Sequence, residues 1–267
     1  MTDRKSEKLD SILKGLKSVV VAFSGGVDSS FLLYRAGLIE NLRYVGMTVV
    51  TSYMPKREIN DAIEFALKHG LNHRVMTITY PEEILNNPPE RCYLCKKHIF
   101  TNLTNFAVSN NFEAVIDGSN ADDIKDYRPG LKALRELRIR SPLMEAGLTK
   151  EEIRELSRKA GLDTSEKPAM ACLLTRLPYN TRVDEDVLRK VEEAENILFE
   201  KGCVGARVRV HGDLARIECL PGYIEKIINN SDREYIIAKF KKLGFRYISL
   251  DLEGYRPEGS NFENRQI

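Results

Sequence analysis

Residues 18–30 read SVVVAFSGGVDSS, an apolar β-branched run followed by a loop of glycine, serine and aspartate. The run at 18–23 is typical of a buried strand, and a helix is expected from residue 29. At such a turn, glycines let the backbone approach phosphate oxygens, and the first N–H groups of the helix attract an anion. The alternative is a glycine turn with a helix N-cap and no ligand. The residues that we predict to bind phosphate are Ser24, Gly25, Gly26, Asp28, Ser29 and Ser30.

Further apolar runs alternate with helical patterns over the first part of the chain. We expect strands at 44–51, 73–79 and 114–117, and helices at 57–69, 95–110 and 149–160. Strands and helices that alternate in this way form a parallel sheet covered by helices. The sequence therefore predicts an α/β domain over residues 1–176, with a Rossmann-like parallel sheet and helices on both faces.

After residue 176 the pattern changes, and a small α+β domain is predicted over residues 177–267. It begins with an amphipathic helix at 183–201. A β-hairpin follows over 206–220, with its turn at Gly212 and Asp213. A helix at 231–243 and a strand at 246–250 complete the predicted domain.

Composition excludes several classes of protein. The chain has 267 residues, of which 42% are hydrophobic and 30% charged, as in a soluble globular protein. It has no apolar run of the roughly 20 residues that cross a bilayer and no signal peptide at its start, so we expect a cytoplasmic protein without membrane contact. The formal net charge of +2 gives no reason to expect nucleic-acid binding.

An acidic loop reads DGSNADD at residues 117–123, directly after a predicted strand, and is followed by DYRPG. Polar groups at the carboxyl end of this strand would lie beside the phosphate loop. Asp122 and Asp123 are therefore candidates for positioning Mg²⁺ and phosphate. The alternative is a solvated acidic loop.

The five cysteines fall into two groups. Cys92 and Cys95 form a single C-x-x-C and Cys172 stands alone, whereas Cys203 and Cys219 lie in apolar stretches and are expected to be buried fillers. A four-thiolate zinc site lacks a second ligand pair, while a thioredoxin-like dithiol fits in part. The third reading is that Cys92, Cys95 and Cys172 converge on one site.

Arg207 and Arg209 alternate on the first strand of the second domain, and Glu218 lies on the partner strand. Paired guanidinium groups match the oxygens of a phosphate. The alternative is an exposed strand face with a cross-strand ion pair. Arg256 is a weaker candidate of the same kind.

The loop SGGVDSS resembles the pyrophosphate-binding PP-loop of the ATP pyrophosphatase superfamily, and it lacks the patterns of the Rossmann fingerprint and the Walker P-loop. This resemblance implies an adenylation domain that splits ATP between its α and β phosphates. Pyrophosphate would lie on residues 24–30 and adenine against the backbone near Thr48 to Thr51. Mg²⁺ would bridge the phosphates.

A wider set of motifs resembles the LarE family. These motifs are SGGVDSS, RCYLCKK, DGSNADDIKDYRPG, SPLMEAGLTKEEIRELSRKAGL, KPAMACLLTR and ARVRVHGDLARIE. Members are ATP-dependent sulfur transferases that act on a dicarboxylated pyridinium mononucleotide, during assembly of the nickel-pincer nucleotide cofactor. The resemblance implies that Arg207, Arg209 and Glu218 hold the substrate phosphate, and that the protein is a homo-oligomer.

The family has two forms, which differ in the source of sulfur. One form donates sulfur from a cysteine in the position of Cys172, whereas the other holds a [4Fe-4S] cluster on three cysteines, as this sequence permits. Three thiolates leave one iron open for a replaceable sulfide, supplied by sulfide or another sulfur source. We predict Cys172, Asp28 and Arg176 as catalytic residues. Alternative functions are tRNA thiolation and a non-catalytic redox sensor that binds ATP and an iron–sulfur cluster.

Overall fold

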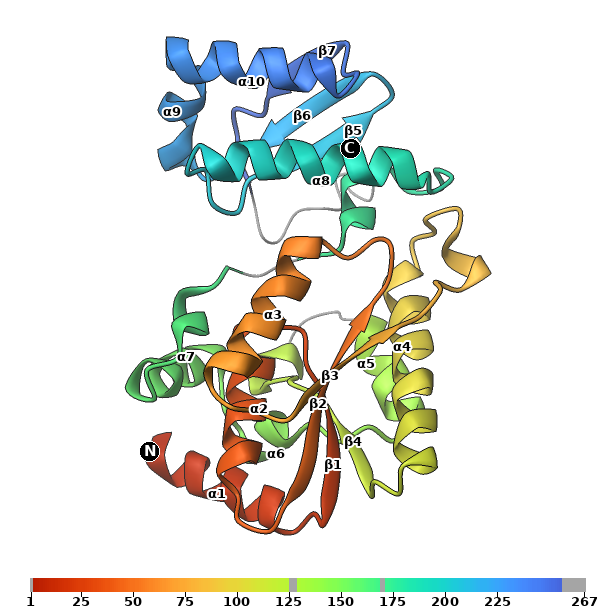
Figure 1. Ribbon diagram of the computed structural model, residues 1–267, viewed down its shortest axis with the longest axis vertical. Helices are drawn as coiled ribbons and strands as arrows, with labels where there is room; N and C mark the ends of the chain where they lie inside the picture. Colours follow the sequence, from red (N-terminus) through yellow and green to blue (C-terminus); the bar gives the residue numbers. More distant parts are fainter. Residues whose placement is uncertain (1, 125–128, 169–170, 256–267) are drawn as a thin grey trace. The chain divides into compact units, whose positions relative to one another are not determined.

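The computed structural model describes residues 2–124, 129–168 and 171–255 (Figure 1). Its internal contacts divide the chain into two compact units. The first unit comprises residues 1–84 and 89–169, and the second comprises 85–88 and the chain from 170 onwards. The sequence-based boundary after residue 176 lies slightly beyond this division. No helix in the described ranges is long and apolar enough to cross a membrane.

The first unit is built on a four-stranded parallel sheet. The order across the sheet is β3 (His73–Thr77), β2 (Arg43–Val50), β1 (Ser18–Ala22) and β4 (Ala114–Ile116). Val20 on β1 is in register with Val45 on one side and Val115 on the other. The apolar run in β1 thus lies in the interior of the sheet, and the predicted α/β fold is confirmed.

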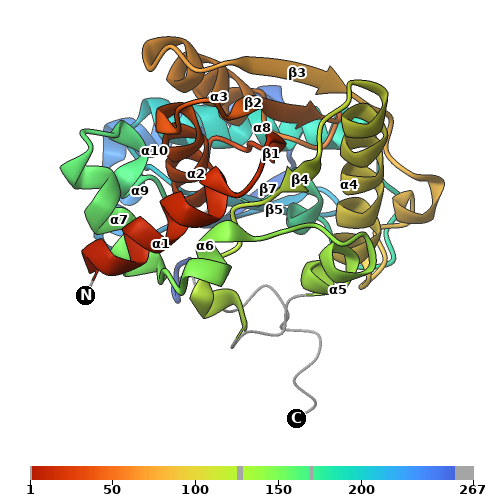
Figure 2. The ribbon, with the colours of Figure 1, turned by 90° about the horizontal axis from the view of Figure 1, so that it is seen from below.

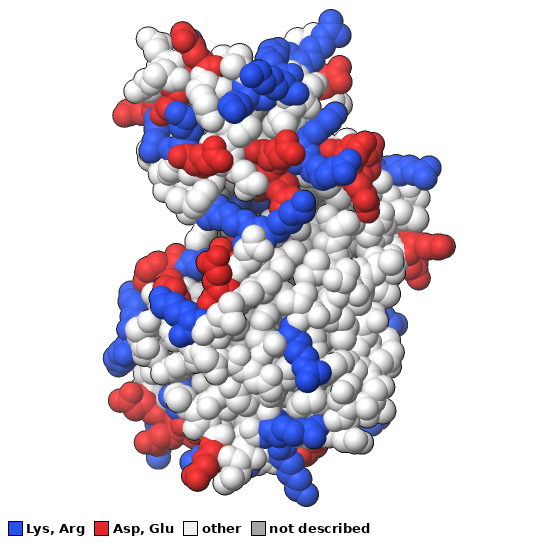
Figure 3. Space-filling view, in the orientation of Figure 1, with Lys and Arg blue, Asp and Glu red and all other residues white. Residues whose placement is uncertain are grey.

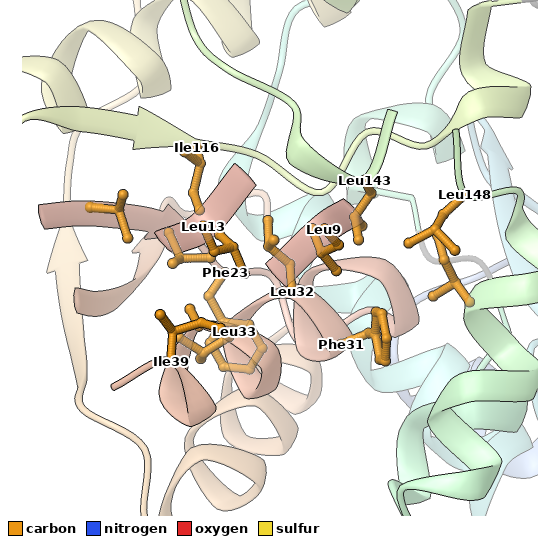
Figure 4. Close-up of a cluster of buried hydrophobic side chains, with 14 of the residues drawn as sticks. Leu9, Leu13, Phe23, Phe31, Leu32, Leu33, Ile39, Ile116, Leu143 and Leu148 are labelled. Carbon is orange, nitrogen blue, oxygen red and sulfur yellow. The ribbon is translucent and has the colours of Figure 1, made fainter. Parts of the chain in front are cut away.

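Helices cover both faces of this sheet (Figures 1 and 2). One face packs against α1 (Thr2–Lys14), α2 (Val27–Leu38), α3 (Lys56–Lys68), α6 (Pro142–Ala146) and α7 (Lys150–Lys159). Figure 4 shows side chains of this core, among them Leu9, Phe31 and Leu143. The other face packs against α4 (Arg91–Ser109) and α5 (Pro129–Glu136). Successive side chains of β1 belong to the two cores in turn, as the period of a strand requires.

Helix α4 corrects one sequence-based boundary. We expected the helix from residue 95, but it begins at Arg91, with Glu90 as its N-cap after the pair Pro88–Pro89. Proline is compatible with the start of a helix but not with its interior, so the helix can begin as soon as the pair has passed. The C-x-x-C therefore lies inside the helix rather than ahead of it.

The second unit is the small α+β fold that the sequence predicts. Strands β5 (Arg207–His211) and β6 (Leu214–Glu218) form an antiparallel hairpin, and β7 (Tyr247–Leu250) pairs parallel to β6. The helices are α8 (Glu185–Glu200), α9 (Ile224–Ile228) and α10 (Asn230–Lys242), with a short 3₁₀ turn, η4, at Leu173–Arg176.

The side chain of Asn87 joins residues 85–88 to the rest of the second unit by hydrogen bonds. Its side chain is fully buried, and its Nδ2 donates to the carbonyl oxygens of Leu174, Leu177 and Pro178 at 3.2, 3.2 and 2.9 Å. The backbone of Asn87 is left-handed, with φ of 47°, a conformation that asparagine tolerates. The link from η4 to α8 is also held by backbone hydrogen bonds, from Asn180 to the Asn87 carbonyl at 3.1 Å and from Val183 to the Leu85 carbonyl at 2.7 Å.

Asn87→Ala should lower the free energy of unfolding of the second unit by roughly 1–3 kcal/mol, because buried carbonyl groups lose their donor. Asn180→Ala is the matched control, since Asn180 is also left-handed, with φ of 57°, but exposed. Urea titrations followed by circular dichroism would measure both variants. Equal losses would mean that the backbone conformation, and not the buried hydrogen bonds, determines the effect.

Candidate functional site

The loop at residues 24–30 joins the carboxyl end of β1 to the first turn of α2. Gly25 has a φ of +73°, and a Cβ at this position would lie 2.9 Å from the Cβ of Ala62. Glycine is therefore required here both by the backbone conformation and by the contact with α3. Gly26 is the N-cap residue of α2 and forms no side-chain cap. A helix N-terminus of this kind suits a bound anion.

Serine hydroxyl groups hold the loop in shape. The backbone N–H of Ser24 donates to Oγ of Ser29 at 3.2 Å, and Oγ of Ser29 donates to the carbonyl oxygen of Gly26 at 3.1 Å. The hydroxyl groups of Ser24 and Ser29 lie 3.1 Å apart. Ser30 is fully buried, and its Oγ has no hydrogen-bond partner. The loop is therefore organised before a ligand arrives, which lowers the entropy lost on binding.

Asp28 forms an ion pair with a residue far along the chain. Its Oδ2 lies 2.5 Å from Nζ of Lys150, at the start of α7. Burial raises the pKa of the Asp28 carboxyl above its usual value, Lys150 opposes the rise, and the charge of Asp123 adds to it. The phosphate loop thus includes a carboxylate and an ammonium group in direct contact.

The acidic loop at residues 117–123 packs directly on the start of α2. A Cβ on Gly118 would lie 3.0 Å from the backbone nitrogen of Ser29, so no larger residue fits without a shift. Asp117 accepts hydrogen bonds from Ser119 at 2.6 Å and Ser141 at 2.5 Å. The two predicted loops therefore lie side by side at one edge of the sheet.

Asp122 and Asp123 have structural partners in this loop. Asp123 accepts from the backbone N–H of Asn120 at 3.0 Å, and Asp122 accepts from the backbone N–H of Lys150 at 2.9 Å. Asp122 thereby ties the loop to the first turn of α7. A role of these two carboxylates toward Mg²⁺ or phosphate stays a prediction.

Two lysines that we did not predict as site residues also lie at these loops. Lys150 contacts Asp28, and Nζ of Lys96 on α4 lies 3.7 Å from Oδ2 of Asp117. One signal for Lys150 is present in the sequence, because Thr149 and Glu152 have the spacing of a capping box, which they form in the structure, and Lys150 is then the first helical residue. The sequence contains no comparable signal for Lys96.

Thr48, the predicted contact of adenine, lies within β2. Its Oγ1 donates to the carbonyl oxygen of Phe23 at 2.9 Å and lies 2.9 Å from Nε2 of His73. Burial lowers the pKa of His73, which favours the neutral ring beside this hydroxyl group. The Thr48 side chain thus joins neighbouring strands, and only its backbone would be available to a base.

Cys92 and Cys95 lie in the first turns of α4, and neither forms a disulfide. Cys92 is exposed and Cys95 is partly buried. Sγ of Cys95 lies 3.0 Å from the hydroxyl oxygen of Tyr53. Residues three apart share one side of a helix, so both thiols can face a common ligand.

Cys172 belongs to the second unit, where it is the N-cap residue of η4. Arg176 is 2% exposed, and its guanidinium group forms a two-point ion pair with Glu195 at 2.8 and 3.0 Å. The same group donates to the carbonyl oxygens of Ala171 and Cys172 at 3.0 and 3.2 Å. Arg176 thereby holds the backbone that carries Cys172, and its predicted catalytic role stays a prediction.

The predicted phosphate arginines lie in the same unit as Cys172. Nε of Arg209 lies 2.5 Å from Oε1 of Glu218, and its NH1 donates to the carbonyl oxygen of Thr175. Arg207 is 3% exposed, and its guanidinium carbon lies 5.3 Å from the centre of the Tyr255 ring. The cross-strand ion pair is therefore present, but the strand face is buried rather than exposed.

Other predicted residues divide into buried cysteines and positions outside the described chain. Cys203 and Cys219 are buried, as predicted, and burial raises the pKa of the Cys219 thiol to about 11. Residues 126–128 and Arg256 lie outside the described residues. In the part of the chain that the structure describes, no three His, Cys, Asp or Glu side chains form a group that could hold a metal ion. The three-cysteine cluster stays a prediction.

Comparisons with known proteins find relatives that match along most of the chain. The chain is 37% identical over 255 residues to the pyridinium-3,5-bisthiocarboxylic acid mononucleotide synthase of Lactiplantibacillus plantarum, covering 94% of this chain and 92% of the relative. An uncharacterised protein of Methanocaldococcus jannaschii is 39% identical over 242 residues, which is 90% of this chain and 91% of the relative. A tRNA-specific 2-thiouridylase of Clostridium tetani is 28% identical, over 73% of this chain and 64% of the relative. No protein-family model matches the chain.

Asp28→Asn should change how stability depends on pH. Burial raises the pKa of Asp28 in the folded state, so the folded protein binds this proton more tightly than the unfolded chain does. The resulting stabilisation is present in acid and is lost as pH rises through the folded-state pKa. The variant should therefore be more stable than the parent at neutral pH, and this difference should shrink in acid. Urea titrations at several pH values would measure it, with exposed Asp213→Asn as control. If the stability of the variant minus that of the parent were smaller at neutral pH than in acid, the raised pKa of Asp28 would be contradicted.

Proposed function

We propose that this chain, which belongs to the LarE family of pyridinium-3,5-bisthiocarboxylic acid mononucleotide synthases, adenylates a carboxylate of pyridinium-3,5-dicarboxylate mononucleotide and converts it to a thiocarboxylate. Family membership makes it a sulfur-transferring enzyme, with thiouridylase relatives in the PP-loop superfamily. The observation that carries the choice of substrate is the 37% identity to the synthase over 94% of the chain. The product would enter nickel-pincer nucleotide assembly, and we expect a cytoplasmic homo-oligomer.

The reaction needs activation because a carboxylate is a poor acceptor of a sulfur nucleophile. The carboxylate oxygen would attack the α-phosphorus of ATP, which forms an acyl adenylate and releases pyrophosphate. Sulfide would then attack the acyl carbon, and AMP would leave with the former carboxylate oxygen. The products are a thiocarboxylate, AMP and pyrophosphate, so atoms and charge balance without a redox step.

The first unit supplies the groups that activation requires. The loop at residues 24–30 would hold the pyrophosphate, supported by the preformed serine contacts and the start of α2. Asp28 and Lys150 meet at the same place: the ammonium group would stabilise the negative charge of the pyrophosphate, and Asp28, Asp122 and Asp123 would hold Mg²⁺. Hard oxygen donors of this kind suit Mg²⁺. Adenine would lie against the backbone after β2.

Cys92, Cys95 and Cys172 would hold the [4Fe-4S] cluster, and the chemistry of these donors fits it. All three are thiols that are not in disulfides, and none is fully buried. The start of α4 favours the negative charge of thiolate ligands. When bound by three thiolates, such a cluster would supply a replaceable sulfide. The alternative is that Cys172 itself donates sulfur once.

The second unit supplies the groups for the substrate phosphate. Arg209 forms an ion pair with Glu218, and Arg216 forms ion pairs with both Glu218 and Asp251, so these side chains hold one another in place on the strand face. Arg207 is ordered by burial and by its contact with Tyr255. The hydrogen bond from Arg209 to the Thr175 carbonyl joins this group to the turn that carries Cys172. The proposed phosphate site would thereby be joined, within the second unit, to Cys172, one of the three proposed cluster ligands.

Thiolation of tRNA is the second candidate, favoured by the 28% identity to the Clostridium tetani 2-thiouridylase. The formal net charge of +2 argues against it. On the face drawn in Figure 3, basic side chains are interspersed with acidic ones and form no continuous stripe. Salt-sensitive co-purification of tRNA would reverse this preference.

Substitutions in the first unit should affect the reaction of ATP, and substitutions in the second unit should affect binding of the mononucleotide. Asp28→Ala should abolish substrate-dependent release of pyrophosphate from ATP but leave binding of the mononucleotide intact. Arg207→Ala should weaken the mononucleotide about ten- to a hundredfold and leave ATP binding intact, because a charged hydrogen bond is lost. Calorimetry and a pyrophosphate assay would test this, with exposed Arg246→Ala as control. Release of pyrophosphate without the mononucleotide, or no thiocarboxylate in the products, would contradict the proposed function.

Replacement of Cys92, Cys95 or Cys172 by alanine should remove the visible absorption of the reconstituted protein and stop sulfur transfer, because each would be a ligand of one cluster. Cys203→Ala is the matched control and should retain both properties. Anaerobic spectra with iron and sulfide analysis would measure the first property, and mass spectrometry of the thiocarboxylate the second. Activity of a C92A/C95A protein, with dehydroalanine at position 172, would instead establish a sacrificial cysteine.

A further inference from the structure

Tyr53 lies just after β2 and is turned into the protein interior. Its side chain is 1% exposed, and its ring packs against Tyr80 with ring centres 5.9 Å apart. The hydroxyl group of a buried tyrosine normally finds a polar partner. Here that group lies 3.0 Å from Sγ of Cys95, a residue 42 positions further along the chain.

We propose that Tyr53 is a positioning residue for the Cys95 ligand, with its phenolic O–H donating to the sulfur. This inference rests on the proposed function, in which Cys95 is a thiolate. A thiolate has no proton to donate, so the direction of the hydrogen bond is then fixed. Helix α4 fixes the backbone of Cys95, and the hydrogen bond from the Tyr53 phenol restricts the direction in which the Cys95 sulfur points.

Cys92 and Cys95 then become unequal ligands. Cys92 is exposed, whereas Cys95 is partly buried and in contact with Tyr53. A hydrogen bond to a ligand sulfur draws negative charge from it and so stabilises the reduced state of a cluster. With a cluster bound, the hydrogen bond from Tyr53 would therefore raise its reduction potential, and Cys92 would be the more exposed of the two thiolate ligands.

Tyr53→Phe tests this inference because it removes the hydroxyl group and keeps the ring. Tyr80→Phe is the matched control, since it removes a hydroxyl group from the neighbouring ring. Anaerobic redox titration of the reconstituted proteins should give a lower potential for Tyr53→Phe than for the parent and Tyr80→Phe, at equal iron content. Site-specific fluorotyrosine at position 53, a stronger donor of nearly the same shape, should shift the potential in the opposite direction.

The outcomes separate this inference from the proposed function. Unchanged potentials in both position-53 variants, with full iron content, would overturn the role of Tyr53 and leave the three-cysteine cluster in place. Absence of iron from the reconstituted parent protein would overturn the cluster and this inference together.

Discussion

The parallel pairing of β1 with β2 on one side and β4 on the other is the constraint on which the first unit depends. Parallel strands end at the same edge of a sheet, so the segments that follow β1 and β4 leave the sheet side by side. The close approach of Gly118 to the backbone of Ser29 is a direct result. Two polar loops are thereby brought into contact although residues 31–116 lie between them in the sequence.

The fold of each unit could be predicted because its signals are local. The run in β1, the loop that follows it and the hairpin of β5 and β6 each carry their pattern in a few consecutive residues. The start of α4 could not be placed, since helix formers continue upstream of Cys95 as far as the two prolines. The helix α1 was also missed, because its polar composition hides the few apolar residues that reach the core, Leu9 and Leu13.

The candidate site was less predictable than the fold, because its contacts join distant residues. The Asp28–Lys150 pair spans 122 positions, and the Arg176–Glu195 pair links a turn to the next helix. Charged residues look alike in a sequence whether they face water or a partner. Nothing in the sequence thus indicated that Arg176, which we predicted as catalytic, contacts Glu195 and the carbonyl oxygens of Ala171 and Cys172. Local motifs identify candidate chemistry, and only packing shows which groups are already engaged.

The four residues Leu85–Pro88 have a consequence for how this protein can be divided. They belong to the second unit by their contacts, although their neighbours on both sides in the sequence belong to the first. A cut near residue 170 would leave Asn87 on one fragment and its acceptor carbonyls on the other. The two units are therefore not modules that recombination could exchange at one crossover point.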